Sequence, residues 1–286
     1  MPRVLCVGHV NWDVSLRLDH LPEPDGESAV RDTTQGGGGS AANVAVGLAG
    51  LDCAATLAGS VGDDEHGLLA RRDLDRAGVD LAGLRTVAGE TTTKYLLVDD
   101  AGEVSVLGAA GVNEALGPDD IDPALVAAAD RVHLTAHRPD TLRRVAEVAT
   151  EAGVPVSVDP GRRLADRDFS DVLALADTLF VNAVEARALD GPEVPVVVTK
   201  RGTEGATVTA PDDSYDHAGF DLPSVDSTGA GDAFAAGFLA ARLRGDGAAD
   251  ALAVANACGA LAAETEGPKT ALSWEAVEAV LAGERA

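Results

Sequence analysis

A chain of 286 residues, 46% of them hydrophobic, is long enough to bury a substantial α/β core and too apolar to be disordered. Its formal net charge of −25 repels phosphate backbones and anionic lipids, so neither nucleic acids nor membranes are expected as partners. No apolar run approaches the roughly 20 residues that cross a bilayer, and the first residues lack the pattern of a signal peptide. We therefore expect a cytoplasmic protein.

The charged residues are distributed in a way that indicates habitat. Asp and Glu total 47, whereas the only lysines are Lys94, Lys200 and Lys269. A surface of dispersed carboxylates with few lysines favours adaptation to high salt, where screening shortens the self-repulsion to about 3 Å. The three cysteines are far apart and lie in apolar segments, which favours buried thiols over disulfides or a metal site.

Short apolar runs alternate with alanine-rich segments along most of the chain. The first run, residues 1–8, is typical of a buried strand that leads to a site at its carboxyl end. Later segments such as TLRRVAEVATEAG have helical spacing and end in glycine. The repetition predicts a three-layer, Rossmann-like α/β fold with a mainly parallel central sheet and helices on both faces. Further strands are expected at ATLAGSVG, RVHLTA, VPVSVDP, TLFVN and VPVVVTKRG.

Two segments depart from this rhythm. Residues 14–34 and 91–112 contain alternating polar and apolar positions, and the second holds an Asp-Ala-Gly turn between two β-rich halves. They predict a small separate β-sheet, which we interpret as a lid. No Pro-, Gly- or Ser-rich linker and no internal repeat divides the chain, so residues 1–286 are expected to form a single domain with this lid.

The most informative segment is VDSTGAGDAFAAGF, from Val225 to Phe238. Its small residues from Thr228 to Gly231 predict a loop at the entrance of an apolar helix, where backbone N–H groups and the positive helix end can face an anion. Asp232 is expected just inside that helix, as an ionised carboxylate. An acid in a first turn can also merely complement the helix dipole, and this segment alone leaves both interpretations open.

This segment resembles the second motif of the ribokinase-like, PfkB family of carbohydrate kinases, and GGGGSAANVAVGLAGLD resembles the first. The order and spacing of NWD, GSVGDDEHG, VNAVEARAL, VTKRGTEGA and NACGALAAETEG match as well, so the resemblance covers essentially the whole chain. It implies a ribokinase fold and an ATP-dependent kinase that phosphorylates a sugar hydroxyl. In that family Asp232 is the base, and the anion hole is formed by the N–H groups of Gly229, Ala230 and Gly231.

The resemblance also assigns residues to the nucleotide and to metal ions. The nucleotide is expected at Asn182, Lys200, Gly202, Gly205 and Asn256. Glu185 is expected to act on Mg²⁺ through water, and Asp226 and Thr228 match positions that hold K⁺ in some members. From the residues alone, Asn182 and Glu185 could form a helix cap, and Lys200 could be an exposed residue of a hairpin turn.

By the same resemblance, the acceptor binds at Asn11, Asp13, Gly38, Gly39 and Asn43. A carboxylate can accept hydrogen bonds from two adjacent hydroxyls, so Asp13 is suited to a diol. The glycine run from Gly36 to Gly39 could instead be a flexible loop that joins lid and core, and this alternative is stronger for its first two glycines.

These motifs do not fix the acceptor. Ribokinases usually show GGKGAN, whereas this chain has GGSAAN, which resembles archaeal nucleoside kinases and, with the composition, points to a halophilic archaeon. A nucleoside is therefore one alternative to a pentose. Basic residues follow two consecutive predicted strands: His137, Arg138, Arg162 and Arg163. Because guanidinium groups bind phosphate bidentately, Arg138 and Arg162 make ribose 1-phosphate or a fructose phosphate another alternative, unless they pair with acids such as Asp140.

Other proteins share this fold without this activity. A catalytically silent regulator that binds a sugar or nucleotide is disfavoured because Asp232 and its glycine loop are intact. Thiamine-pathway and pyridoxal-type kinases generally lack the pattern of Asn11, Asp13 and Asn43. Lid sheets in the family often pair between two subunits, and exposed strand edges favour such pairing, so a homodimer through the lid is expected.

Overall fold

The computed structural model describes residues 1–100, 104–187, 189, 193–265 and 271–284. Its larger sheet has the strand order β13-β12-β11-β10-β9-β8-β1-β4-β5. The strands are β1 (Arg3–Val7), β4 (Ala54–Gly62), β5 (Asp80–Val87), β8 (Arg131–Thr135), β9 (Val156–Asp159), β10 (Thr178–Asn182), β11 (Val196–Lys200), β12 (Ala206–Thr209) and β13 (Ser214–His217).

The strands from β5 to β11 pair in parallel, and the pairs β11–β12 and β12–β13 are antiparallel. The carboxyl ends of the parallel strands therefore lie along one edge of the sheet, which is where α/β folds of this kind bind their ligands.

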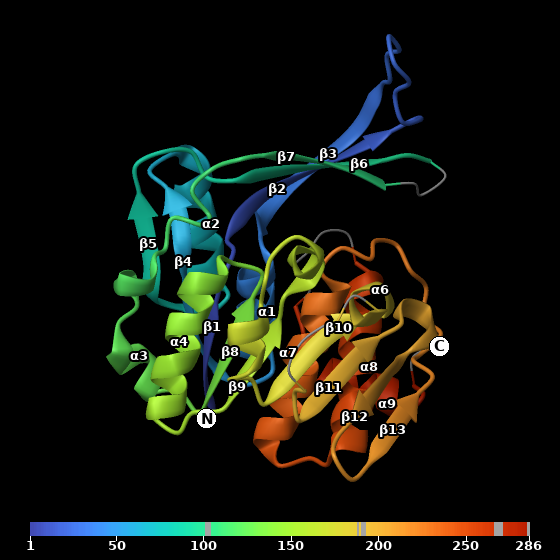
Figure 1. The fold of residues 1–286 in the computed structure, drawn as a ribbon. Coiled ribbons are helices and arrows are strands. Elements are labelled where there is room, and N and C mark those ends of the chain that lie inside the picture. Colours follow the sequence, from blue (N-terminus) through green and yellow to red (C-terminus); the bar gives the residue numbers. More distant parts are fainter. Residues whose placement is uncertain (101–103, 188, 190–192, 266–270, 285–286) are drawn as a thin grey trace.

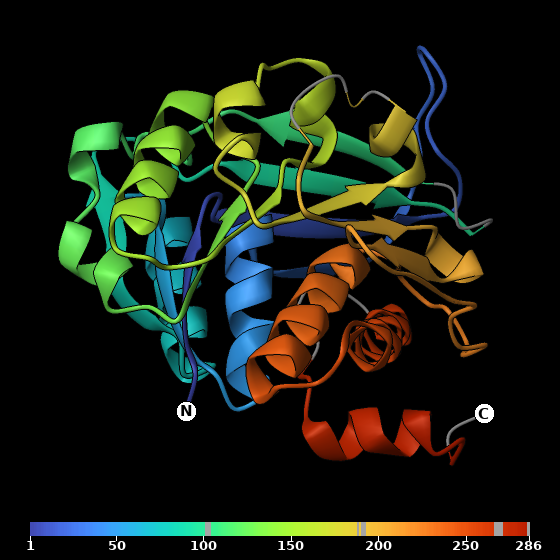
Figure 2. The same ribbon diagram turned by 60° about the horizontal axis from the view of Figure 1, so that its bottom comes forward.

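Helices cover both faces of this sheet, as Figure 2 shows. One face carries α1 (Ser40–Gly50), α2 (Glu65–Arg76), α7 (Ala230–Arg244), α8 (Ala248–Ala263) and α9 (Trp274–Leu281). The other carries α3 (Pro123–Ala127), α4 (Pro139–Glu151), α5 (Ser170–Leu173) and α6 (Ala183–Arg187). Short 3-10 helices are η1 (Pro118–Asp120), η2 (Gly161–Ala165) and η3 (Gly202–Glu204). None of the described helices has the length and apolar character needed to cross a membrane.

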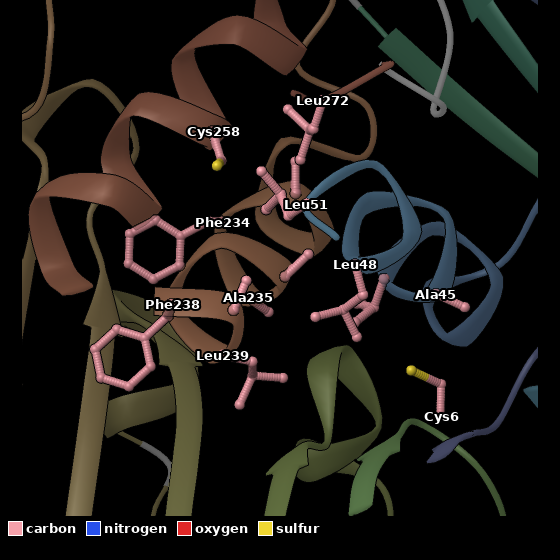
Figure 3. Packing of buried hydrophobic residues seen from close by; sticks show 14 of the residues in the cluster. Cys6, Ala45, Leu48, Leu51, Phe234, Ala235, Phe238, Leu239, Cys258 and Leu272 are labelled. Carbon is pink, nitrogen blue, oxygen red and sulfur yellow. The ribbon is translucent and has the colours of Figure 1, made fainter. Parts of the chain in front are cut away.

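The alternation of side chains along a strand places a hydrophobic core on each face. In β1, Val4 and Cys6 pack on the side of α7, whereas Leu5 and Val7 pack on the side of α4. Figure 3 shows the first of these cores, where Leu48 of α1 and Leu239 of α7 approach each other. The three cysteines are buried thiols, as their apolar surroundings predict. The predicted three-layer fold with a mainly parallel sheet is confirmed.

A second, smaller sheet lies beyond the carboxyl ends of the central strands (Figure 1). It has the order β3-β2-β6-β7 and is formed by β2 (Asn11–Leu18), β3 (Val30–Gly38), β6 (Thr93–Val98) and β7 (Val104–Ala109). Strands β2 and β6 pair in parallel, and the outer pairs are antiparallel. The predicted small sheet is thus confirmed, although two of the three residues of its Asp-Ala-Gly turn lie outside the described residues.

The first two strands of the second sheet extend beyond the predicted segment 14–34 at both ends. Strand β2 starts at Asn11, and β3 continues to Gly38. Gly36 and Gly37 are paired with Asp13 and Trp12 of β2, so the flexible-loop alternative for these two glycines is wrong.

Candidate active site

Lys200 and Asp159 form an ion pair at the carboxyl edge of the central sheet. They are the last residues of β11 and β9, and Nζ of Lys200 donates to Oδ2 of Asp159 at 2.6 Å. The alternative of an exposed hairpin lysine is wrong, because the Lys200 side chain is only 17% exposed. Burial lowers the pKa of Lys200, but the charge and hydrogen bond of Asp159, together with the charges of Asp232 and Glu185, outweigh burial and keep that pKa above its ordinary value. Lys200 is therefore charged throughout the neutral range.

This ammonium group faces the first turn of α7. Its Nζ lies 3.6 Å from the point that a Cβ would occupy at Gly231. Asp232 and Glu185 are both close enough to contribute to the raised pKa of Lys200. The positive charge of Lys200 and the positive end of α7 thus meet at one place, where the anion hole is predicted.

Asp232 lies in that first turn and contacts the other glycine-rich motif of the sequence through Asn43. Nδ2 of Asn43, on α1, donates to Oδ2 of Asp232 at 2.8 Å. Burial raises the pKa of Asp232 to about 6 from 3.8, and Asp159 adds to the rise. The hydrogen bond from Asn43 and the charge of Lys200 act in the opposite direction without cancelling it. Asp232 is thus less easily ionised than its place in a helix start suggests, yet it remains mainly a carboxylate at neutral pH.

The loop before α7 is shaped by its own hydrogen bonds. Gly229 caps the helix with a φ of 78°, a conformation that glycine adopts readily. The N–H of Thr228 donates to Oδ1 of Asp226 at 2.8 Å, and the N–H of Ala230 donates to the Ser227 carbonyl at 3.2 Å. The N–H of Ala230 thus already has a hydrogen-bond partner, which it would have to release in order to bind an anion.

The predicted K⁺ position lies near the carbonyl of Ala263, whose hydrogen bonds limit the oxygen ligands that a cation could find there. The carbonyl of Ala263 accepts from the N–H groups of Val225 at 2.7 Å and Asp226 at 3.1 Å. Both lone pairs of this oxygen are therefore in use, and a cation beside Asp226 and Thr228 would need other oxygen ligands. The resemblance to the family also implies a carbonyl ligand near Gly267, which lies outside the described residues.

Asn11 and Asp13 lie where the two sheets meet. Both are buried, and they pair in register with Gly38 and Gly36 across β2 and β3. A Cβ at Gly38 would lie 2.0 Å from Oδ2 of Asp13, so only glycine leaves room for this carboxylate. Gly39, with a φ of 98°, then leads into α1 and Asn43. The structure therefore brings the five predicted acceptor residues together beside Asp232.

Lys94 lies in the same place, although the sequence does not single it out as a site residue. It is the register partner of Asp13 across the parallel strands β2 and β6. When the amide of Asn11 presents its oxygen to Lys94, it accepts a hydrogen bond from Nζ at 3.2 Å. Lys94 also lowers the pKa of Asp232, which places its charge close to the predicted base.

Three further polar residues near Asn11, namely His9, Glu114 and Arg167, are also absent from the sequence-based prediction. Nε2 of His9 lies 3.0 Å from Oε1 of Glu114, and Arg167 donates to both Glu114 oxygens at 2.9 and 3.0 Å. The hydrogen bond from His9, followed by that from Arg167, holds the pKa of Glu114 well below its ordinary value. The ring of His137 lies 5.6 Å from the ring of His9.

The two arginines predicted at the acceptor have different surroundings. Arg138 pairs with Asp140 at 2.5 Å, the alternative that the sequence leaves open, and its side chain is 46% exposed. Arg162 is exposed in η2. The neighbouring Arg163 is exposed as well. Burial lowers the pKa of His9, and the charges of Lys94 and Arg163 lower it further.

A pocket extends from Lys200 along the start of α7 to α8. Four of the five residues predicted for the nucleotide line it together, namely Lys200, Gly202, Gly205 and Asn256. Its walls are largely apolar, with Phe220, Leu222, Phe234 and Ala260 among them. An apolar slot that ends at a lysine and a helix start fits an adenine ring with its phosphates.

Asn182 and Glu185 are joined in a helix cap. Oδ1 of Asn182 accepts from the N–H groups of Val184 and Glu185, each at 2.8 Å, and Oε2 of Glu185 accepts from the N–H of Asn182 at 2.9 Å. Asn182 does not line the pocket. Within the described residues no group of three or more metal-ligating side chains occurs. The single buried carboxylate of Glu185 fits a Mg²⁺ ion held mainly by phosphates and water.

Comparisons with known proteins place this site in a family. The model of the pfkB family carbohydrate kinases matches residues 1–275. An ATP-dependent ribose-1-phosphate kinase of Halopiger xanaduensis is 57% identical over 98% of both chains. A nucleoside kinase of Methanothermobacter thermautotrophicus is 32% identical over 93% of this chain and 91% of its own.

Solved structures agree with this. Arabidopsis thaliana ribokinase, complexed with ribose and ATP, has a TM-score of 0.86 and 26% identity, with 98% of each chain covered. The nucleoside kinase of Methanocaldococcus jannaschii has a TM-score of 0.87 and 24% identity, with 99% of each chain covered, and shows the fold alone. The chain belongs to the pfkB family of carbohydrate kinases, which confirms the prediction of an ATP-dependent sugar kinase.

Proposed function

We propose that the protein phosphorylates ribose 1-phosphate with ATP. The observation that carries this proposal is the 57% identity, over 98% of both chains, to an ATP-dependent ribose-1-phosphate kinase. Of the alternatives that the sequence leaves open, the already phosphorylated sugar is thus the best supported. The reaction joins the γ-phosphoryl group of ATP to a hydroxyl of the pentose and releases ADP.

In this proposal Asp232 is the general base. It accepts the proton of the attacking hydroxyl, the oxygen forms a bond to the γ-phosphorus, and the bond between that phosphorus and the ADP oxygen breaks. A pKa of about 6 suits the role, since the group is mainly ionised at neutral pH and still basic enough to accept a proton. Asn43 holds one of its oxygens at 2.8 Å and so directs the other.

The phosphoryl group in transit is stabilised by charge and by backbone dipoles. We assign this role to Lys200 and to the N–H groups of Gly229, Ala230 and Gly231 at the start of α7, with Ala230 exchanging its hydrogen bond to the Ser227 carbonyl for one to the phosphoryl group. Lys200 supports the assignment because it is charged, largely buried and 3.6 Å from the Cβ position of Gly231. Such groups act where charge develops, in a place that excludes water.

ATP would occupy the apolar pocket, with its base near Asn256 and its phosphates near Lys200, Gly202 and Gly205. Mg²⁺ would reach the phosphates with water between it and Glu185, and Asn182 would orient that carboxylate. K⁺ beside Asp226 and Thr228 is a further part of the proposal, supported by the match to positions that hold it in other family members.

The acceptor would bind between the two sheets. Asn11, Asp13 and Asn43 offer carbonyl and carboxylate oxygens to the sugar hydroxyls, and Gly38 and Gly39 let the ring approach the backbone. The second sheet would then act as a lid that excludes water during transfer. Arg138 and Arg162 remain predicted ligands whose side chains would have to turn inward from exposed positions.

The finer features of habitat and assembly are part of the same proposal. A net charge of −25 with three lysines supports a cytoplasm of high salt, as expected for a halophilic archaeon. A homodimer through the lid is supported by exposed apolar side chains on β6 and the edge strand β7 of the second sheet, Tyr95, Val106 and Leu107.

A nucleoside is the second candidate acceptor, because a nucleoside kinase is 32% identical over 93% of the chain. An acceptor panel separates the two. At molar KCl with Mg-ATP, ADP release is measured with ribose 1-phosphate, ribose, fructose 6-phosphate, cytidine and adenosine. We expect the highest kcat/KM on ribose 1-phosphate. A higher value on a nucleoside would replace the proposed acceptor while leaving the kinase assignment in place.

A further inference from the structure

Three of the cations around the site already have an acidic partner. Lys200 pairs with Asp159 at 2.6 Å, Arg138 with Asp140 at 2.5 Å, and Arg167 with Glu114 at 2.9 Å. These charges are largely neutralised before any ligand arrives. A negatively charged part of the acceptor would gain little from them, because their existing ion pairs would have to be broken first.

Lys94 and Arg163 differ from these residues. Within the part of the chain that the structure describes, neither makes an ion pair within 4.0 Å of an acid. Lys94 reaches the acceptor region from β6, where it lies beside Asp13 and 3.2 Å from the Asn11 amide oxygen. Arg163 belongs to η2, which follows β9 at the carboxyl edge of the larger sheet, and its side chain is exposed. Burial lowers the pKa of His9, and the charges of Lys94 and Arg163 both lower it further, which places both cations in the neighbourhood of this imidazole.

Buried polar atoms without partners lie in the same region. Both ring nitrogens of His137, which is fully buried, lack a hydrogen-bond partner, and so does Oδ1 of Asn43. The His137 ring is 5.6 Å from that of His9. Buried polar atoms normally have partners, so their absence here indicates that a polar ligand completes the site.

We propose that Lys94 and Arg163, together with His9, form the subsite for the phosphate group that the acceptor already carries, with the Arg163 side chain turning inward when the phosphate binds. This rests on the proposed function and adds the residues by which a phosphorylated sugar is distinguished from a free one. A phosphate monoester carries close to two negative charges and matches two unpaired cations. In this arrangement Asn11 and Asp13 bind the other hydroxyls of the sugar, and Asp232 accepts the proton of the hydroxyl that reacts.

The location of Lys94 has a consequence for selectivity. Lys94 belongs to the second sheet, whereas Arg163 and His9 belong to the larger α/β part. A phosphate held between them would tie the two sheets together, so a phosphorylated acceptor would favour closure of the lid more than a free sugar. Preference for the phosphorylated sugar would then appear in both binding and turnover.

The test uses the full-length protein with Lys94→Met and Arg163→Gln, and with Arg144→Gln as the matched control on the exposed side of α4. Arg144 lies 3.8 Å from Glu147, far from the strand ends. Values of kcat and KM are measured for ribose 1-phosphate, ribose and ATP, and calorimetry measures ribose 1-phosphate binding without ATP. A charge-assisted contact predicts a rise in KM for ribose 1-phosphate of roughly 10- to 100-fold in each site variant.

In Arg163→Gln we expect kcat/KM for ribose and KM for ATP to change less than about 3-fold, and Arg144→Gln to behave as wild type. Lys94→Met also loses the contact with Asn11 and the charge that acts on Asp232, so kcat/KM for ribose should fall there too, but at least about 10-fold less than kcat/KM for ribose 1-phosphate. A loss shared equally by ribose, ribose 1-phosphate and ATP would mean a structural effect and overturn the subsite, as would unchanged discrimination in both variants. Melting temperatures and a Lys94→Arg variant, which keeps the charge, guard against a folding defect. A wild-type enzyme that does not prefer ribose 1-phosphate to ribose would overturn the proposed function itself.

Discussion

Asn43 donates a hydrogen bond from Nδ2 to Oδ2 of Asp232 at 2.8 Å, and this contact joins residues 189 positions apart in the sequence. It connects the first turn of α1 with the first turn of α7, so the two glycine-rich motifs of the chain meet at one carboxylate. Hydrogen bonding favours the ionised form of Asp232, whereas burial disfavours it, and burial prevails. The amide of Asn43 thus links the residues predicted to bind the acceptor to the predicted base, Asp232.

The first prediction concerns the pH dependence of this carboxylate. Only ionised Asp232 can act as a base, so kcat/KM for the acceptor should fall as pH drops through about 6. In Asn43→Leu the hydrogen bond to the charged form is lost, and the midpoint should move to higher pH by roughly one unit. The measurement is the pH profile of kcat/KM for both proteins. Coincident midpoints would show that Asn43 does not tune Asp232.

The second prediction concerns Lys200. In Lys200→Met the charge facing the first turn of α7 is lost and Asp159 remains without its partner. We expect kcat to fall roughly 100- to 1000-fold, as it does when a preorganised donor is removed from a charge-stabilising site. The control is Arg201→Gln, whose guanidinium pairs with Asp216 at 2.7 Å near the surface. Equal losses in both variants would speak against a role specific to Lys200.

The third prediction concerns the apolar pocket. Ala260 of α8 lines the pocket, so the indole ring introduced by Ala260→Trp should fill the space assigned to adenine. ATP affinity should fall at least about 10-fold, while calorimetric binding of ribose 1-phosphate stays unchanged. Ala249→Trp places the same ring on an exposed position of the same helix and should bind ATP normally. Unaltered ATP binding by Ala260→Trp would place the nucleotide elsewhere.

The fourth prediction concerns Glu114, which holds His9 and Arg167 together. Its pKa is depressed in the folded state, so its contribution to stability is present above its ordinary value of 4.5 and is lost as pH falls below it. Glu114→Gln should therefore lower the free energy of unfolding by about 1 to 2 kcal/mol at pH 7, with a difference that narrows in acid. Glu147 pairs with Arg143 on the surface, so Glu147→Gln should lower the free energy of unfolding by less than about 0.5 kcal/mol. Denaturant titrations at pH 7 and pH 4 check both.

Much of this arrangement could be predicted from the sequence, because it follows from local patterns. The loop before Asp232, the strand ends and the two glycine-rich segments are continuous in sequence, and their placement at one edge follows from a parallel sheet. Asn43 was expected at the acceptor, although its contact with Asp232 was not. That contact depends on how α1 and α7 pack on the same face, which spacing along the chain does not encode.

The site residues that could not be predicted from the sequence were missed for one physical reason. Asp159 is a single acid at the end of a strand, and only the neighbouring strands show that it meets Lys200, 41 positions away. Lys94 lies in the middle of an alternating strand, and its direction depends on the parallel register of β2 with β6. The contact between His9 and Glu114 spans 105 positions. In each case the partner is defined by strand order or register rather than by a local motif.

The most direct test of this account compares wild type with Asp232→Asn in acceptor-dependent ADP formation from Mg-ATP and ribose 1-phosphate at molar KCl. The substitution keeps the size of the side chain and an oxygen that can accept from Asn43, but it removes the base. We predict turnover in wild type and a loss of at least about 1000-fold in Asp232→Asn, with calorimetric binding of ATP retained. Comparable turnover in both proteins would contradict the assignment of Asp232 as the base, and the absence of turnover in wild type would contradict ribose 1-phosphate as its acceptor.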